Sequence, residues 1–263
     1  MQVVEEILRS VRADLENLEK DSKRGDLVGS YDQSRLSKAS SPPRDIIERA
    51  RSLRTKGIDP IIAEIKPRVL GRALMPGEVA QIARHYEEMG ACAISVLTQP
   101  VYFMGSVENL KIARESTSAS IPILRKDFIL DERQFEGPKS DLILLIVAFS
   151  QPLDDLIEAA RARGMEPLVE VHTDEELNEA LKTDARIIGI NNRNLKTLEI
   201  NLGTFERLGP IAKASGAFVI AESGVESRND VSRMIDAGAD ALLVGTSLMK
   251  EPTKLMELNG LGR

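Results

Sequence analysis

The sequence predicts one (β/α)₈ barrel preceded by an N-terminal helical extension. Eight short runs rich in Ile, Val and Leu recur between residues 61 and 246, and a segment with helical periodicity follows nearly every run. Near-continuous apolar strands that alternate with helices are typical of a parallel sheet covered on both faces, and eight such units close into a barrel. An open, doubly wound sheet is the alternative arrangement of the same elements.

The eight predicted strands begin about 20 to 30 residues apart, the spacing expected of barrel units. Each strand is short, apolar and bounded by a polar or small residue, as buried parallel strands are. They are IIAEIK (61–66), CAISVLT (92–98), IPILRKDF (121–128), DLILLIV (141–147), EPLVEV (166–171), RIIGINN (186–192), AFVIAES (217–223) and DALLVGT (240–246).

Helical patterns lie between the predicted strands and after the last of them. Several open near Ser, Thr or Asp and end in Gly, as capped helices do. The unit between the third and fourth strands is thin, because Gly137 and Pro138 would stop a helix after about two turns. We expect a truncated helix there, and full helices at 76–90, 106–116, 153–164, 174–183, 202–215, 227–238 and 247–259.

The first sixty residues form the predicted extension. Residues 3–25 have helical periodicity, and residues 31–57 combine a Ser/Pro loop with a second helical segment. Sixty residues are few for a separate domain. We therefore expect residues 1–60 to pack on the barrel of residues 61–263, with one of the barrel's mouths as a candidate place, in one domain overall.

Composition narrows the class of protein. With 263 residues, 42% hydrophobic and 29% charged, the chain can fold around a large core. A net charge of -6 argues against a nucleic-acid partner, because proteins that bind nucleic acids normally have a basic surface. Cys92 is the only cysteine, and neither it nor His85 or His172 lies at metal-ligand spacing from another Cys or His. We expect a cytoplasmic monomer or weak oligomer that binds a small molecule, with no metal site and no membrane segment.

Polar side chains stand at the ends of five predicted strands. Glu64 and Lys66 lie two residues apart in the first strand and therefore project to the same face. Alone, this pair fits either a structural ion pair or part of a functional site. Active sites of this fold lie at the carboxyl ends of the strands, so several such ends together indicate a catalytic cluster. The other residues at these ends are Lys126, Asp127, Glu170, Asn191, Arg193, Glu222 and Ser223.

Two loops predict a phosphate site. Ser223 and Gly224 follow the seventh strand, and Gly245 and Thr246 follow the eighth, directly before a helical segment. Small residues let a ligand approach the backbone, and N–H groups at a helix start attract anions. Each Gly alone also fits an ordinary turn. The loops after strands seven and eight are, however, where this fold often binds phosphate.

At this point the chain resembles the indole-3-glycerol phosphate synthase family of tryptophan biosynthesis. The motifs that carry the resemblance are IIAEIK, SVLT with YFMGS, ILRKDFILDERQ, PLVEVHTDEEL, IGINNRNLKTLEIN, AESGV and LLVGTSLM. They occur in the family's order and cover most of residues 61–250. The resemblance implies ring closure of 1-(2-carboxyphenylamino)-1-deoxyribulose 5-phosphate, with loss of carbon dioxide and water, and no cofactor.

The resemblance also implies roles for individual residues. Lys126 would be the general acid at the ketone, and Glu170 the base or proton shuttle of the dehydration. Glu64 and Asn191 would position the substrate, while Lys66 would contact its carboxylate, and the division of acid duty between the two lysines stays open. Supporting and aromatic contacts would come from Arg193, Glu222, Ser223, Phe103 and Phe128, and the phosphate would lie on Ser223, Gly224, Gly245 and Thr246.

A lysine that donates a proton near neutral pH needs a lowered pKa. Burial near a second ammonium group lowers the pKa of a lysine, and neighbouring carboxylates oppose that effect. Because Lys66 belongs to the same predicted cluster, we expect the pKa of Lys126 to be lowered. A Schiff-base aldolase with Lys126 as nucleophile is an alternative function. A non-catalytic barrel that serves as a partner of other pathway enzymes is a second alternative.

The chain departs from the family pattern after the first strand. There the family has a Ser-Pro-Ser segment that helps to hold phosphate, whereas this chain reads PRVLGRAL (67–74). Arg68, Gly71 and Arg72 are the candidates to replace the lost contacts, since guanidinium groups suit phosphate. Gln99 also stands where the family usually has an acidic residue.

Overall fold

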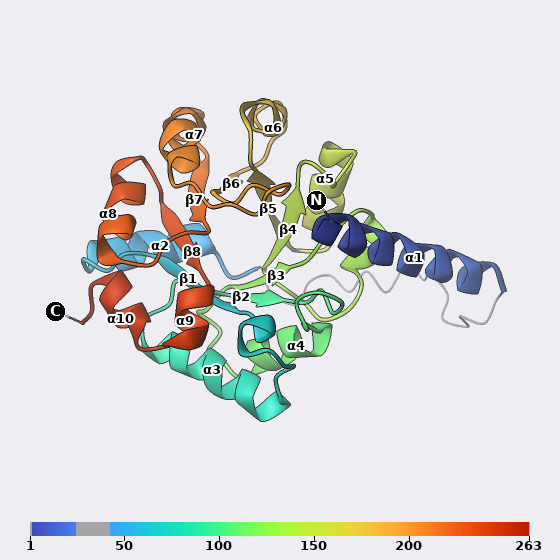
Figure 1. Ribbon diagram of the computed structural model, residues 1–263, viewed down its shortest axis with the longest axis horizontal. Coiled ribbons are helices and arrows are strands. Elements are labelled where there is room, and N and C mark those ends of the chain that lie inside the picture. Colours follow the sequence, from blue (N-terminus) through green and yellow to red (C-terminus); the bar gives the residue numbers. More distant parts are fainter. Residues whose placement is uncertain (1, 25–42, 263) are drawn as a thin grey trace.

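Eight parallel strands close into a barrel in chain order (Figure 1). The computed structural model describes residues 2–24 and 43–262. The last strand returns to the first, with Ile61 opposite Leu242 and Ala63 opposite Val244. This closure confirms the predicted barrel and excludes the open sheet. The strands are β1 (Ile61–Ile65), β2 (Ala93–Leu97), β3 (Ile123–Lys126), β4 (Leu142–Ile146), β5 (Glu166–Val171), β6 (Ile187–Asn191), β7 (Phe218–Glu222) and β8 (Ala241–Val244).

Helices surround the barrel and follow the predicted order. The truncated helix expected after the third strand is confirmed, as the four-residue 3₁₀ helix η3. The single helix expected over 247–259 is wrong: Pro252 cannot continue a helix, and two short helices form instead. The helices are α1 (Gln2–Arg24), α2 (Ile46–Thr55), η2 (Pro67–Leu70), α3 (Pro76–Glu88), α4 (Val107–Glu115), η3 (Glu132–Phe135), α5 (Leu153–Ala162), α6 (Asp174–Ala180), α7 (Gly203–Ala214), α8 (Arg228–Asp236), α9 (Thr246–Lys250) and α10 (Lys254–Asn259).

Side-chain caps fix where several helices begin. Ser106 accepts a hydrogen bond from the backbone N–H of Asn109 at 3.1 Å, and Thr173 accepts one from Glu176 at 3.2 Å. Each of these bonds satisfies an N–H group that has no partner within its own helix. Because Thr173 caps α6 only two residues after the end of β5, the first turn of α6 lies beside the end of that strand.

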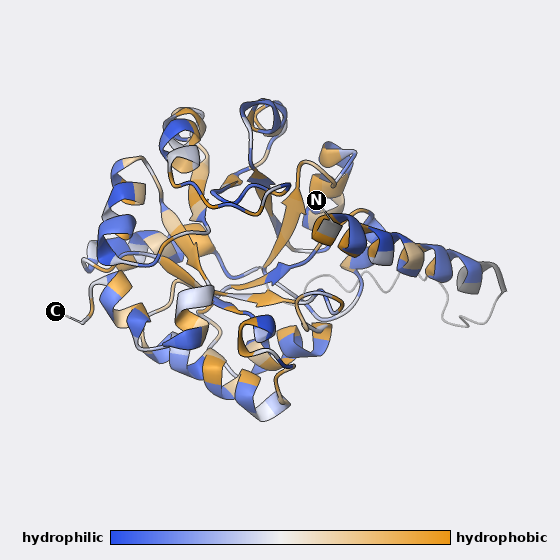
Figure 2. Ribbon diagram, in the orientation of Figure 1, coloured by the Kyte–Doolittle hydropathy of each residue, from blue (hydrophilic) through white to orange (hydrophobic). Residues whose placement is uncertain are grey.

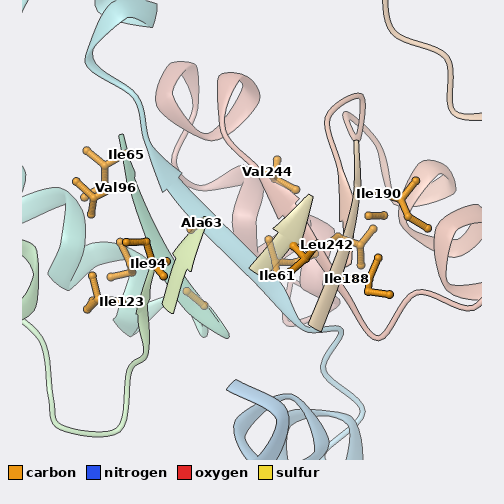
Figure 3. Close-up of a cluster of buried hydrophobic side chains, with 14 of the residues drawn as sticks. Ile61, Ala63, Ile65, Ile94, Val96, Ile123, Ile188, Ile190, Leu242 and Val244 are labelled. Atoms are coloured by element: carbon orange, nitrogen blue, oxygen red, sulfur yellow. The ribbon is translucent and has the colours of Figure 1, made fainter. Parts of the chain in front are cut away.

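The alternation of side chains along the strands divides the core in two. Ile61, Ala63 and Ile65 face the surrounding helices, where they join the outer cluster drawn in Figure 3. Ile62 belongs to the cluster inside the barrel, so Glu64 projects to the interior as well. Figure 2 shows the strands mainly in the colour of hydrophobic residues and the surrounding helices in mixed colours. The interior therefore offers few polar groups other than those at the strand ends.

The two helices that precede the barrel lie at its opposite ends. Arg49 and Arg54 of α2 donate hydrogen bonds to carbonyl groups just before the strands, at Ala91 (3.0 Å) and Ala239 (2.6 Å). Ile7 of α1 is buried in the interior cluster, and it lines a cavity at the carboxyl ends of the strands. We retain as a proposal the division into an extension (1–60) and a barrel (61–263) within one domain. Over residues 2–24 and 43–262, every helix is too short or too polar to cross a bilayer.

Candidate active site

A cavity of about 610 Å³ opens at the carboxyl ends of the strands. The structure brings every predicted site residue to the wall of this cavity, which contains residues from all eight strands and several of their loops. Its wall also contains residues that were not predicted, from α1, α9 and the loop after β6. The predicted residues are Glu64, Lys66, Phe103, Lys126, Phe128, Glu170, Asn191, Arg193, Glu222, Ser223, Gly224, Gly245 and Thr246, and the others include Val3, Val4, Leu195, Leu198, Ile200, Ser247 and Lys250.

Lys126 lies between two carboxylates at the base of the cavity. Lys126 is the last residue of β3, and its Nζ donates to Glu170 Oε2 at 2.9 Å and to Glu222 Oε2 at 2.8 Å. The lysine side chain is 14% exposed and the two carboxylates are 3% and 1% exposed. A buried ammonium group flanked by two acids is a stable charge arrangement only because the hydrogen bonds offset the loss of solvation.

The expectation that the pKa of Lys126 is lowered is wrong. Burial by itself lowers that pKa, but the charges of Glu170, Glu222 and Glu64 together outweigh burial and raise it. Lys126 is therefore an ammonium group at neutral pH. The sequence predicts that Lys66 belongs to the same cluster, but it does not show that Glu170 and Glu222 contact Lys126 directly.

The two carboxylates differ in their affinity for protons. Burial is the largest influence on Glu222, and with the nearby charge of Glu170 it raises the pKa of Glu222 to about 8, against the opposing effect of Lys126. Burial acts in the same direction on Glu170, but Lys126 and His172 overcome it and hold the pKa of Glu170 well below its usual range. At neutral pH the pair consequently carries one proton, on Glu222.

Glu64 and Lys66, the residues of the first strand, form a loose pair. Lys66 Nζ lies 4.0 Å from Glu64 Oε1 and 5.5 Å from the centre of the Phe103 ring. Glu64 lines the cavity, and its Oε2 is buried without a hydrogen-bond partner. An unpartnered buried carboxylate oxygen is costly, so this oxygen is a natural acceptor for a ligand hydroxyl.

Two glycines make room for the carboxylates. A Cβ at Gly245 would lie 2.4 Å from Glu64 Oε1, and a Cβ at Gly189 would lie 2.2 Å from Glu222 Oε1. Gly245 was predicted as a phosphate contact, but the structure adds this second requirement. Gly189 was missed, although a glycine inside a strand is a known sign of close approach.

Aromatic side chains form one wall of the cavity. The rings of Phe103 and Phe128 are stacked, with centroids 6.5 Å apart and planes inclined by 21°, and the Phe149 ring lies 6.2 Å from Phe128. Leu195, Leu198 and Ile200 also line the cavity, from the loop after β6. This wall suits a flat, apolar group such as a benzene ring.

The side chains of Asn191, at the end of β6, and Asp127, directly after β3, form hydrogen bonds within the protein. Asn191 Oδ1 accepts from the backbone N–H of Arg193 at 3.0 Å, which leaves its amide NH₂ for a ligand. Asp127 accepts from Thr98 Oγ1 at 2.5 Å and from Arg125 at 3.2 Å. Asp127 thus supports the end of β3 through its own neighbours.

The loop after β7 has an uncommon backbone. Ser223 and Gly224 both have positive φ angles, 64° and 87°. A Cβ at Gly224 would also lie 2.6 Å from Ile200 and 2.9 Å from Leu202, so only glycine fits there. A non-glycine residue at positive φ, such as Ser223, is often a sign of a functional loop.

Comparison with known proteins identifies the family. The family model "Indole-3-glycerol phosphate synthase" matches residues 4–259 of the chain. The chain belongs to this family. A relative named indole-3-glycerol phosphate synthase from Haloarcula marismortui is 43% identical over 221 residues, covering 81% of this chain and 79% of that protein. One of the same name from Mycobacterium sp. strain KMS is 40% identical over 254 residues, covering 94% and 89%.

A solved structure supports the fold alone. The tryptophan synthase alpha chain from Legionella pneumophila aligns with a TM-score of 0.60 at 12% identity, covering 84% of this chain and 97% of that chain. Among residues 2–24 and 43–262, no three His, Cys, Asp or Glu side chains are grouped so that they could hold a metal ion.

The departures from the pattern expected of an indole-3-glycerol phosphate synthase have specific structural outcomes. Arg68 lines the cavity, where it stacks 3.7 Å from the centre of the Tyr102 ring and donates to the Tyr102 carbonyl at 2.9 Å. Arg72 lies outside the cavity wall and pairs with Glu78 through hydrogen bonds of 2.6 and 2.8 Å. Gln99 accepts from the backbone N–H of Tyr102 at 2.9 Å, a contact that an acidic residue would also make.

Proposed function

We propose that the chain catalyses ring closure of 1-(2-carboxyphenylamino)-1-deoxyribulose 5-phosphate to indole-3-glycerol phosphate, with release of carbon dioxide and water. One observation carries the proposal beyond family membership. A buried lysine with two carboxylates stands at the base of a cavity that has an aromatic wall on one side and small-residue loops on the other. The substrate has the matching parts: a benzene ring, a ketone and a phosphate.

Lys126 supplies the acid in the first step. The ring carbon that bears the carboxylate attacks the ketone, and the ketone oxygen takes a proton as the new carbon–carbon bond forms. Lys126 is charged at neutral pH, so it polarises the carbonyl by a charged hydrogen bond before the proton moves. Glu170 and Glu222 hold the ammonium group in place during this step.

Loss of carbon dioxide then restores the aromatic ring. The carbon–carbon bond to the carboxylate breaks, and its electron pair returns to the ring. Lys66 stands over Phe103, where its charge orients the substrate carboxylate before it leaves. Phe103 and Phe128 hold the benzene ring against the cavity wall.

Dehydration completes the reaction. The hydroxyl group leaves as water with one added proton, while a base removes a proton from the neighbouring carbon. Glu170 is the base, because its pKa keeps it ionised at neutral pH. Glu64 Oε2 and the amide of Asn191 orient the substrate hydroxyls.

The phosphate binds at the opposite side of the cavity. Ser223 supplies a hydroxyl group, and the backbone at Gly224, Gly245 and Thr246 allows close approach. Arg193 is tied to the carbonyl of Leu198 at 3.0 Å, so it stabilises the loop after β6 that closes this side of the cavity. We propose that the enzyme works in the cytoplasm, as a monomer or weak oligomer.

The test is the appearance of indole fluorescence when the purified protein meets the carboxyphenylamino-deoxyribulose phosphate. One carbon dioxide should be released per indole product. A Schiff-base aldolase would instead leave a covalent adduct on Lys126 after borohydride treatment, which the charged state of this lysine disfavours. A folded protein that gives neither fluorescence nor adduct would favour a non-catalytic partner role.

A further inference from the structure

His172 lies directly behind Glu170, outside the set of residues given a role above. It follows β5 by one position and is two residues from Glu170, so both side chains leave the same face of the chain. His172 Nε2 lies 3.2 Å from Glu170 Oε1, and its side chain is 6% exposed. The N–H of Nε2 is poorly aligned with that oxygen, so the contact is an ion pair rather than a well-formed hydrogen bond.

Glu176 fixes the histidine from the other side. This residue in the first turn of α6 accepts from the backbone N–H of His172 at 2.6 Å and lies 3.0 Å from its Nδ1. The imidazole thus stands between two carboxylates. Burial lowers the pKa of His172, but Glu170 and Glu176 outweigh burial and raise it to about 9. His172 is therefore an imidazolium at neutral pH.

Glu222 has no comparable partner. Its Oε2 shares Lys126 with Glu170, while its Oε1 is buried without a hydrogen-bond partner beside Gly189. Lys126 is nearly equidistant from the two acids, at 2.9 and 2.8 Å, so it cannot distinguish them. Among the described residues, the imidazolium of His172 is a positive charge that acts on Glu170 but not on Glu222.

We propose that His172, held by Glu176, is a positioning residue that assigns the shared proton of the carboxylate pair to Glu222 and keeps Glu170 ionised. The proposal rests on the proposed function for its catalytic consequence, because a base must be ionised to accept a proton. The other charged groups around the pair are Lys126 from β3 and Glu64 from β1, which acts on Lys126. Asp174 of α6 is 53% exposed and pairs with Arg207 of α7.

The first test removes the charge and keeps a hydrogen-bond donor. In His172→Gln, Glu170 loses a positive charge within 4 Å, which raises its pKa by about one to three units. Activity that needs the Glu170 carboxylate is lost as pH falls through this pKa, so the acid limb of kcat/KM should move to higher pH by at least about one unit. Glu176→Gln should not raise this limb, because a His172 midpoint lowered from about 9 by about one unit leaves the ring charged at the pH where Glu170 titrates.

Asp174→Asn is the matched control, since it neutralises an acid on the same helix turn that does not face His172. It should leave the acid limb unchanged. A purely structural role of His172 predicts lower activity or a lower melting temperature with the acid limb in its original place. That result in His172→Gln would overturn the proposal.

A second test does not depend on activity. The chain has two histidines, and His85 is exposed on α3, so His85→Gln leaves His172 as the only source of imidazole ¹⁵N signals. We expect both ring nitrogens of His172 to stay protonated until the pH approaches about 9. In the same background, Glu176→Gln should lower this midpoint by at least about one unit. A neutral ring at pH 7 would overturn the proposal even if the protein makes indole product, whereas a charged ring without product would contradict the proposed function only.

Discussion

Gly189→Ala should disable the site by adding one methyl group. Gly189 lies in β6, opposite Glu170 on β5, and faces the barrel interior. The new Cβ would lie 2.2 Å from Glu222 Oε1 and 3.1 Å from Leu168 Cδ1. Since ordinary contacts begin near 3.4 Å, the carboxylate must retreat by about 1 Å. Its hydrogen bond from Lys126, now 2.8 Å long, would then break.

Two costs follow from this displacement. Overpacking a buried site costs about 1 to 3 kcal/mol of the free energy of unfolding, or about 2 to 4 °C in melting temperature per kcal/mol. A misplacement of about 1 Å at a catalytic group lowers kcat by up to about 100-fold. The backbone contributes little, because Gly189 does not have a positive φ and Ala can adopt its conformation.

The assay is steady-state product fluorescence together with thermal melting. Gly77→Ala is the control, because Gly77 has open space around its Cβ position and lies in the first turn of α3, where Ala is favourable. Shortening the displaced acid in the double variant Gly189→Ala with Glu222→Asp should recover melting temperature without restoring full activity. Wild-type kcat and melting temperature in Gly189→Ala would refute the claim that this glycine positions Glu222.

Three further predictions concern Lys126, Arg68 and Glu222. Lys126→Met should lower kcat at least about 100-fold with the fold intact by circular dichroism, and more than a tenth of the activity would contradict the assigned acid. If Arg68 turns from Tyr102 to the phosphate, Arg68→Ala should raise KM about 10- to 150-fold. Arg72 lies outside the cavity, so Arg72→Ala is the control and should leave KM unchanged. Equal KM values in the two variants would mean that Arg68 contacts only Tyr102. The pKa of Glu222 is raised from 4.5 to about 8, so its native form holds an extra proton in that window and stability should fall as pH rises through it. Glu222→Gln should flatten this fall in melts at pH 5 and 8, and an unchanged slope would contradict the raised pKa.

The fold could be predicted because its pattern is local. Continuous apolar runs at regular spacing require burial on both faces, which predicts a parallel sheet covered by helices, and the number of eight units favours the closed barrel over the open sheet. Capping residues such as Thr173 and the breaking pair Gly137 and Pro138 also act on their own neighbours. The failure at 247–259 is local too, because the helical periodicity of the segment outweighed the effect of Pro252 in the prediction.

The membership of the site could be predicted, but its electrostatics could not. Strand ends in this fold converge, so position in sequence was enough to gather Lys126, Glu170 and Glu222 in one cavity. The pKa of Lys126 depends on the contacts of its Nζ with Glu170 and Glu222, at 2.9 and 2.8 Å. A shift of one residue in the register of a strand would remove those contacts, and the sequence does not give the register. Gly189 and His172 were missed for the same reason: each acts through a neighbour on another part of the structure.

The proton balance of the proposed reaction explains why two unlike acids surround one lysine. The ketone oxygen and the departing hydroxyl each take a proton, and one carbon gives a proton up, so each turnover consumes one proton from solvent. Lys126 can donate once before it must be recharged. Glu222 carries a proton below about pH 8 and lies 2.8 Å from Lys126, so it can reprotonate the lysine directly, while ionised Glu170 accepts the proton from carbon. A site with two ionised carboxylates would hold Lys126 as firmly but would lack this second donor, and a site with two neutral acids would lack the base.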